Sequence, residues 1–141
     1  MILLDTNVLS EVMRPRPAAA VIDWLNNTDS ALLYTSAVTI GEIEYGLAAL
    51  PGGRRQNDLR QRFEHFVARA FAHRVLPYDE PAAQYYGALM AERRSQGRPM
   101  TAPDGQIAAI ARHHRMAVAT RNVADFAATG VEIINPWETG G

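Results

Sequence analysis

Four acidic side chains are spaced along the chain so that each lies just after a short apolar run or at the start of a helical pattern. They are Asp5, Glu42, Asp104 and Asp125. Carboxylates are oxygen ligands of the kind that Mg²⁺ and Mn²⁺ prefer. A bound cation can lower the pKa of a water molecule and orient it toward a phosphodiester. The chemistry to consider is therefore metal-assisted hydrolysis.

Each of these acids also has a structural explanation. Asp5 can cap the helix that follows it or close an Asx turn. Thr39 and Glu42 have the spacing of a capping box at a helix start. Asp104 falls in the first turn of a predicted helix, where the macrodipole favours a negative charge by about 0.3 to 1 kcal/mol. Asp125 follows a later apolar run and can cap a short helical turn. Taken singly, no acid requires a functional role.

The elements that would position these acids alternate along the chain. Apolar runs predict strands at residues 2–4, 32–34, 75–76, 116–119 and 131–134. Between them lie an apolar stripe of helical period over residues 59–71 and two helices over residues 81–95 and 103–114. The segment PGG at residues 51–53 predicts a turn before the first of these helices. Strands that alternate with helices indicate a mostly parallel sheet covered on both faces.

The shared position of the four acids favours a function over four separate caps. Parallel strands end at one edge of a sheet, and ligands bind in the crevice at that edge. Ser, Thr and Asn cap helices as well as Asp does, so capping alone does not explain an acid at every position. Carboxylates brought this close repel each other unless a cation neutralises them or some of them take up protons. The sequence therefore predicts a site for Mg²⁺ or Mn²⁺.

Composition limits the class of protein. A chain of 141 residues with 48% hydrophobic residues fits one domain, residues 1–141, that buries roughly two-thirds of its unfolded surface. No apolar run approaches the ~20 residues of a membrane span, and the start lacks a signal-peptide pattern, so we expect a cytoplasmic protein without a membrane partner. The absence of cysteine excludes disulfides and thiolate sites. Because the formal net charge is −1, contacts with nucleic acid would have to come from local arginines.

Six stretches that span the chain in order carry a resemblance to a known family. They are MILLDTNVLSE, TSAVTIGEIEYG, LPYDEPAAQYYG, TAPDGQIAAIARHH, VATRNVADF and INPW. The chain resembles the PIN-domain ribonucleases, and within them the VapC toxins of toxin–antitoxin systems, most closely the FitB-like subgroup. The resemblance implies an α/β fold, a PIN-like three-layer α/β/α sandwich with a short, mostly parallel central sheet. It also implies the toxin component of a type II toxin–antitoxin system, acting as an Mg²⁺-dependent endoribonuclease.

The resemblance assigns the metal ligands in part. Asp5, Glu42 and Asp104 match the metal-binding acids of the family. In part of the family an aspartate occupies the position of Asn122, whereas other members share the RNVxDF form present here. Either Asn122 is a ligand through its amide oxygen or Asp125 takes that role.

Other residues are expected to support the site or the RNA. Thr6 and Thr120 resemble the hydroxyl residues that hydrogen-bond the ligands in such sites. We expect two or three of the arginines in or beside predicted loops and helix ends to contact an RNA backbone; the candidates are Arg14, Arg16, Arg54, Arg55, Arg93, Arg94 and Arg98. Trp24 and Trp137 are predicted to be packing residues. Since no histidine stands near any of the acids in the sequence, we favour metal-activated water over acid–base cleavage through the ribose 2′-hydroxyl.

The resemblance also implies partners. Family members usually form homodimers, and a cognate VapB-like antitoxin inhibits them by filling the acidic groove, often with an arginine. A guanidinium suits a pocket built to hold cations. The implied partners are therefore this antitoxin, in a hetero-oligomer, and an RNA substrate. Operator DNA would be bound only through the antitoxin, because the chain itself offers no DNA-reading element.

Three alternatives compete with this interpretation. An Mg²⁺-dependent phosphatase of the haloacid dehalogenase type needs a second aspartate two residues after the first, where this chain has Asn7. A receiver-like signalling domain needs a lysine late in the chain, and the chain has no lysine. The third alternative is a PIN-fold protein that has lost catalysis and serves as a binding module.

Overall fold

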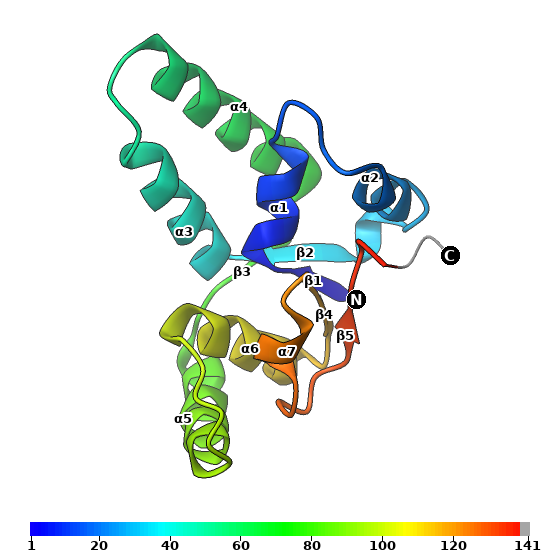
Figure 1. Ribbon diagram of the computed structural model, residues 1–141, viewed down its shortest axis with the longest axis vertical. Helices are drawn as coiled ribbons and strands as arrows, with labels where there is room; N and C mark the ends of the chain where they lie inside the picture. Colours follow the sequence, from blue (N-terminus) through cyan, green and yellow to red (C-terminus); the bar gives the residue numbers. More distant parts are fainter. Residues whose placement is uncertain (139–141) are drawn as a thin grey trace.

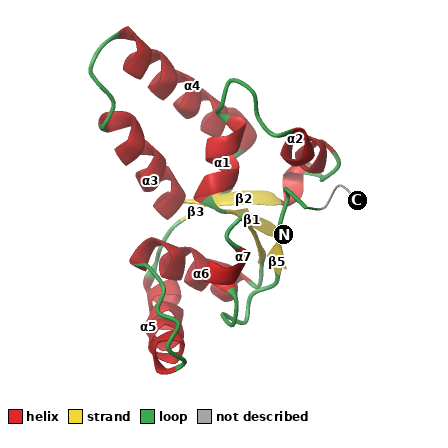
Figure 2. Ribbon diagram, viewed as in Figure 1, coloured by secondary structure: helices red, strands yellow, loops and turns green. Residues whose placement is uncertain are grey.

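A central sheet of five parallel strands organises the computed structural model, which describes residues 1–138 (Figures 1 and 2). The strands are β1 Ile2–Leu4, β2 Leu33–Ser36, β3 Val75–Leu76, β4 Ala117–Ala119 and β5 Ile133–Ile134. Their order in the sheet is β3-β2-β1-β4-β5, and every neighbouring pair is parallel. The predicted parallel sheet is confirmed. Residues 139–141 of the predicted domain lie outside the described residues.

Helices cover both faces of the sheet (Figure 1). One layer contains α1 Thr6–Val12, α2 Ala19–Asn26, α3 Ala37–Ala48 and α4 Arg54–Ala70, and a short 3₁₀ turn, Ser30–Leu32, leads into β2. The other layer contains α5 Glu80–Ser95, α6 Ala102–His114 and α7 Val123–Phe126. The predicted three-layer α/β/α sandwich is therefore confirmed. Among the helices of residues 1–138, none has the length and apolar character needed to cross a membrane.

The apolar start of the chain joins the two layers. Successive side chains of a strand point to opposite faces of the sheet. Accordingly, Leu3 belongs to the core cluster under α5 and α6, which includes Ile107, and Leu4 belongs to the cluster under α1 and α4, which includes Val8 and Phe63. Burying each such side chain stabilises the fold by about 1.5 to 3 kcal/mol. The central strand is thus fixed on both faces up to the residue before Asp5.

The start of α3 differs from the sequence prediction. Strand β2 continues to Ser36, which has extended backbone angles and accepts a hydrogen bond from Thr39 N at 3.2 Å as the N-cap. The predicted capping box of Thr39 and Glu42 is therefore wrong, because the helix begins two residues before Thr39. Glu42 lies further along α3 and has no capping role.

A close helix contact positions the start of α6. A Cβ added at Gly105 would lie 2.5 Å from Met90 Sδ and 3.0 Å from Tyr86 Cε2. A larger residue at this position would therefore force the side chains of Met90 and Tyr86 on α5 to shift. The N-cap of α6 is Thr101, whose hydroxyl accepts from Asp104 N at 3.4 Å. Asp104 therefore lies in the first turn, as predicted.

Candidate metal centre

Asp5 lies at the carboxyl end of β1 and is almost fully buried, with 3% of its surface exposed. Its backbone N–H continues the sheet by donating to Ala119 O at 2.9 Å. One carboxylate oxygen accepts from Thr6 N at 2.8 Å, which makes Asp5 the N-cap of α1. The other accepts from Thr120 Oγ1 at 2.8 Å and from Asn7 Nδ2 at 3.2 Å. The predicted cap is confirmed, and it fixes the carboxylate in one orientation.

Glu42 comes from α3 and is tied to the start of α1. Thr6 Oγ1 donates to Glu42 Oε1 at 2.6 Å and lies 3.2 Å from Thr39 Oγ1. Thr39 is fully buried, so the contact between these two hydroxyls holds the start of α1 against α3. Thr6 thus touches Asp5 through its backbone and Glu42 through its side chain.

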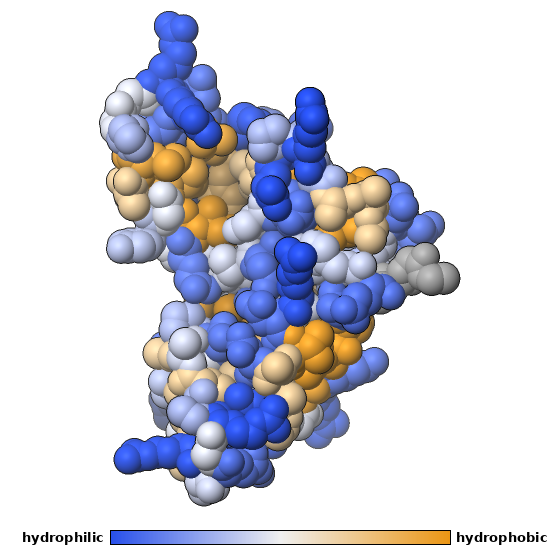
Figure 3. All heavy atoms as spheres, viewed as in Figure 1, coloured by the Kyte–Doolittle hydropathy of each residue, from blue (hydrophilic) through white to orange (hydrophobic). Residues whose placement is uncertain are grey.

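One cleft of about 430 Å³ brings these acids together with Asp104 and Asn122. The remaining residues that line it are Thr6, Asn7, Ser10, Glu11, Arg14, Arg121 and Trp137. Hydrophilic side chains gather over the middle of the molecule, where α1, α3 and α6 converge, and apolar ones gather over α3 and α4 (Figure 3). The cleft lies at the carboxyl edge of the sheet, where the strand ends were expected to meet.

The acids of the cleft affect each other's ionisation. Burial is the largest cause that raises the pKa of Asp5 to about 6; hydrogen bonds from Thr120 and Thr6 lower this pKa, and the negative charges of Asp104 and Glu42 raise it. Burial also raises the pKa of Asp104, as do the charges of Asp125 and Glu42, and the hydrogen bond from Thr101 opposes them. These carboxylates therefore repel each other, and a bound cation would relieve that repulsion.

The residues of the cleft fit a hard divalent cation whose remaining ligands are waters and substrate phosphates. Within residues 1–138, no three acidic or histidine side chains converge closely enough to hold a metal ion by themselves. Mg²⁺ commonly binds through one or two carboxylates and completes its shell with waters and substrate phosphates. The cleft offers carboxylate, amide and hydroxyl oxygens, which suit Mg²⁺ or Mn²⁺ better than softer metals.

Both candidates for the fourth ligand lie near the cleft. Asn122 lines it, and its backbone N–H donates to Thr120 Oγ1 at 3.0 Å. Asp125 lines a neighbouring cavity and acts on the cleft through its charge on Asp104. The predicted capping role of Asp125 is wrong, because α7 has Asn122 at its N-cap and Asp125 in its first turn.

Two polar residues of α1 belong to the site although sequence reasoning did not assign them to it. Asn7 donates to Asp5 Oδ2 and to Thr120 Oγ1, both at 3.2 Å. Glu11 is 6% exposed and accepts from Ala18 N at 3.0 Å. The spacing of Asn7 and Glu11, four residues apart, puts them on one helix face and was the signal that could have found them.

The arginines predicted to contact RNA have different surroundings. Arg14 lines the cleft and forms an ion pair with Glu11 at 3.4 Å. Arg93 is 4% exposed and donates to the backbone carbonyls of Arg98, at 2.6 Å, and Ala127. Of the seven candidates, two or three were expected to contact RNA; Arg93 is not suited to that role, because its guanidinium is buried inside the protein.

Arg121 and Trp137 form a stacked pair in the cleft. The Arg121 guanidinium carbon lies 5.3 Å from the centre of the Trp137 ring. Trp137 packs against the core cluster under α1 and α4, which confirms its predicted packing role, and it also lines the cleft. Sequence reasoning treated Arg121 only as part of a motif, because nothing in the sequence placed it beside the tryptophan.

Comparisons with known proteins agree with this architecture. The PIN domain model matches residues 2–131. The chain is 45% identical over 138 residues to the VapC ribonuclease Y4jK of Sinorhizobium fredii, covering 98% of this chain and 99% of the relative. It is 42% identical over 137 residues to the toxin FitB of Neisseria gonorrhoeae, covering 97% and 99%. A solved structure of FitAB bound to an IR36 DNA fragment superposes with a TM-score of 0.93 at 42% identity, over 100% of this chain and 99% of that chain.

Proposed function

Because the chain belongs to the PIN domain family, we propose that it is the toxin of a VapBC-type toxin–antitoxin pair and a metal-dependent endoribonuclease. The observation that carries this proposal is the meeting of Asp5, Glu42 and Asp104 in one cleft. These acids come from three separate segments of the chain. The charges of Asp104 and Glu42 raise the pKa of Asp5, and the charge of Glu42 raises the pKa of Asp104. Relatives that match nearly the whole chain are named as a toxin and as a ribonuclease.

The residues of the cleft have distinct roles in the proposed reaction. Asp5, Glu42 and Asp104, with Asn122 or Asp125, would hold Mg²⁺ or Mn²⁺. When bound, such a cation supplies Lewis acidity and an activated water for attack on a phosphodiester. Hydrogen bonds to the carboxylates fix the ligand orientation before substrate arrives; the donors are Thr120, Asn7 and Thr6.

We propose hydrolysis by metal-activated water rather than acid–base cleavage through the ribose 2′-hydroxyl. Within the described chain, no histidine lines the cleft to act as a general base. The products are therefore expected to carry no 2′,3′-cyclic phosphate. End analysis of the cut RNA by mass spectrometry checks this, and a cyclic phosphate would contradict the mechanism.

The proposed partners follow from the family and from a solved complex. We propose that a cognate VapB-like antitoxin inhibits the chain in a hetero-oligomer and that the chain forms a homodimer. A related toxin is present in the FitAB assembly bound to DNA, which supports an operator contact made through the antitoxin. We also propose that residues 1–141 form a single domain.

A pair of glutamate variants tests the nuclease assignment. Glu42 lines the cleft, whereas Glu44 on the same helix forms an ion pair with Arg60 of α4 at 3.5 Å. The wild type, Glu42→Gln and Glu44→Gln would be purified free of antitoxin and incubated with total cellular RNA in Mg²⁺ or in EDTA. We expect discrete cuts by the wild type and Glu44→Gln in Mg²⁺ and none in EDTA. Glu42→Gln should cut at least 100-fold more slowly, because it loses one charged oxygen ligand.

Two outcomes would contradict the proposal. Equal cleavage by Glu42→Gln and the wild type would show that the cleft does not hold the reactive metal. A folded wild type that binds RNA without cutting it would favour the catalytically inactive binding module.

A further inference from the structure

The stacked pair Arg121 and Trp137 has a feature that the metal chemistry does not use. The Trp137 ring packs against the core, and the Arg121 guanidinium lies over the ring with its side chain exposed. A guanidinium over an aromatic ring is held there by cation–π attraction. The pair therefore presents a planar cation backed by an aromatic ring at the wall of the acidic cleft.

This surface is rigidly attached to the acids. Arg121 directly follows Thr120, whose hydroxyl donates to Asp5 at 2.8 Å. The backbone N–H of Arg121 donates to Asn7 Oδ1 at 3.3 Å, and Asn7 also contacts the Asp5 carboxylate. The backbone of Arg121 is thus connected to Asp5 through two hydrogen-bonded routes, and the contact with Trp137 locates the guanidinium, so a group bound on it would sit beside the metal ligands.

The Arg121 guanidinium forms no ion pair with a carboxylate of residues 1–138. Within residues 1–138, the ion pairs of arginines with acids are those of Arg14 with Glu11 and Arg60 with Glu44. Arg121 lies among acidic residues of the cleft but stacks on Trp137 instead of pairing with any of them. An arginine that served only stability would be expected to form an ion pair with one of these nearby carboxylates. Its position over Trp137 therefore points to an external ligand.

We propose that Arg121 on Trp137 is a stacking platform for one nucleobase of a single-stranded RNA, next to the phosphate that is cut. Bases of single-stranded RNA stack on arginine planes and aromatic rings, and such stacking tolerates different sequences. The platform would hold the base while the neighbouring phosphate enters the acidic part of the cleft. This proposal rests on the proposed function, since it assigns a subsite for the RNA substrate.

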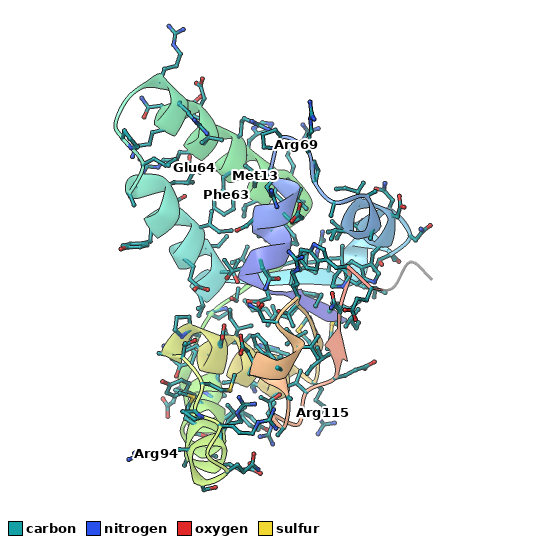
Figure 4. The ribbon with its side chains drawn as sticks, viewed as in Figure 1. Met13, Phe63, Glu64, Arg69, Arg94 and Arg115 are labelled. Carbon is teal, nitrogen blue, oxygen red and sulfur yellow. The ribbon has the colours of Figure 1, made fainter. Side chains whose placement is uncertain are left out.

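A charge-conserving variant separates stacking from simple attraction to phosphate. Arg121→Lys keeps the positive charge but lacks the plane that stacks on a base. Arg115→Lys is the matched control, because Arg115 is exposed at the C-cap of α6, at the opposite end of that helix from Asp104 (Figure 4). Both changes would be made in an Asp5→Asn background, so that the RNA stays intact whatever the reaction mechanism.

The probes are a fluorescein-labelled single-stranded oligoadenylate of twelve nucleotides and the same sugar–phosphate chain without bases. Fluorescence anisotropy would give the dissociation constant for each. We expect the background protein to bind oligoadenylate about tenfold more tightly than the abasic chain, within the range of one stacking contact. Arg121→Lys should lose this preference by weakening oligoadenylate binding about tenfold, and Arg115→Lys should retain it.

Trp137 gives a second readout. The chain contains two tryptophans, so Trp24→Phe leaves Trp137 as the reporter of events at the platform. Oligoadenylate should change Trp137 fluorescence, and the abasic chain should not.

The platform is overturned if Arg121→Lys binds oligoadenylate as the background does, if the background binds both probes equally, or if it binds neither. The nuclease assignment is decided separately by the glutamate pair. Loss of cleavage in Glu42→Gln together with unchanged binding in Arg121→Lys would leave the nuclease standing without this subsite.

Discussion

Asp5 combines a structural and a chemical role at one strand end. Its carboxylate caps α1 and at the same time faces the cleft that contains Glu42 and Asp104. The cap alone would be satisfied by Ser, Thr or Asn. A buried aspartate at this position destabilises the fold once it is ionised, which occurs above its raised pKa of about 6. The stability lost through Asp5 in the absence of metal is consistent with selection for function at this position.

Removal of the Asp5 charge should stabilise the metal-free protein at neutral pH. The pKa of Asp5 is about 6 in the folded chain, against 3.8 ordinarily, so the folded state binds the proton more tightly than the unfolded chain. The contribution of protonated Asp5 to folding stability is fully present below pH 4 and is lost as the pH rises from 4 to 6. Asp5→Asn should therefore gain up to about 2 kcal/mol over the wild type above pH 6 and little at pH 4.

Urea unfolding in EDTA at several pH values checks this difference. Asp58→Asn is the matched control, since Asp58 is an exposed carboxylate of α4. A stability difference between Asp5→Asn and the wild type that stays constant from pH 4 to pH 8 would contradict the burial argument.

At the level of residues, the positions of Asp5 after a strand and of Asp104 in the first turn of a helix were enough to predict that both lie at one edge of the sheet. Glu42 also lines the cleft, although it lies further along α3 than its predicted place at the helix start. The sequence did not predict the hydrogen bonds that hold these acids. Asn7 and Thr120 are 113 residues apart, and their contact depends on the pairing of β1 with β4. The local sequence around either residue does not predict a contact between two residues so far apart in the chain.

At the level of elements, Arg93 connects the segments that carry Asp104 and Asp125. Its guanidinium donates to the carbonyl of Arg98, before α6, and to the carbonyl of Ala127, after α7. Sequence reasoning placed Arg93 on the surface because it stands beside Arg94 near the end of a helix. Tertiary packing decides which of two adjacent arginines is buried, and charge alone does not reveal it.

Substitution of Arg93 should be far more destabilising than substitution of its neighbour. Arg93→Ala leaves two carbonyls without their donor and removes buried side-chain packing, so we expect a loss of about 2 to 4 kcal/mol in the free energy of unfolding. Arg94→Ala changes an exposed side chain and should stay within about 0.5 kcal/mol. Urea unfolding of both variants measures this. Equal stability of the two would show that the Arg93 hydrogen bonds contribute nothing net.

The element boundaries show a second limit of sequence reasoning. Ser36 and Thr39 are both good caps, and local pattern does not choose between them. The strand pairing of Ser36 with Leu76 extends β2 and makes Ser36 the cap. By contrast, the PGG turn before α4 was predictable, since Gly53 has φ 137, a conformation that favours glycine.

At the level of the whole molecule, electrostatics should contribute to RNA binding only locally. The formal net charge is −1, so long-range attraction to RNA is weak. The arginines of the cleft are Arg14 and Arg121. Binding must then depend on a few phosphate contacts and on shape.

The salt dependence of RNA affinity measures the number of those contacts. With two to four phosphates neutralised, the logarithm of the association constant should fall with the logarithm of salt at a slope of about −1.4 to −2.8. Anisotropy titrations of the single-stranded oligoadenylate with Asp5→Asn in increasing KCl would give the slope. A slope steeper than about −5 would require a basic surface that this account does not contain.

The central claim is that the acidic cleft holds a divalent cation, and Mn²⁺ binding followed by electron paramagnetic resonance tests it most directly. We predict that the wild type binds Mn²⁺ and that Mg²⁺ competes for the site. Asp5→Asn, Glu42→Gln and Asp104→Asn should each weaken binding at least tenfold, while Glu44→Gln should not. Comparison of Asn122→Ala with Asp125→Asn would identify the fourth ligand. Mn²⁺ affinity that is absent in the wild type, or unchanged in all three acid variants, would contradict the claim.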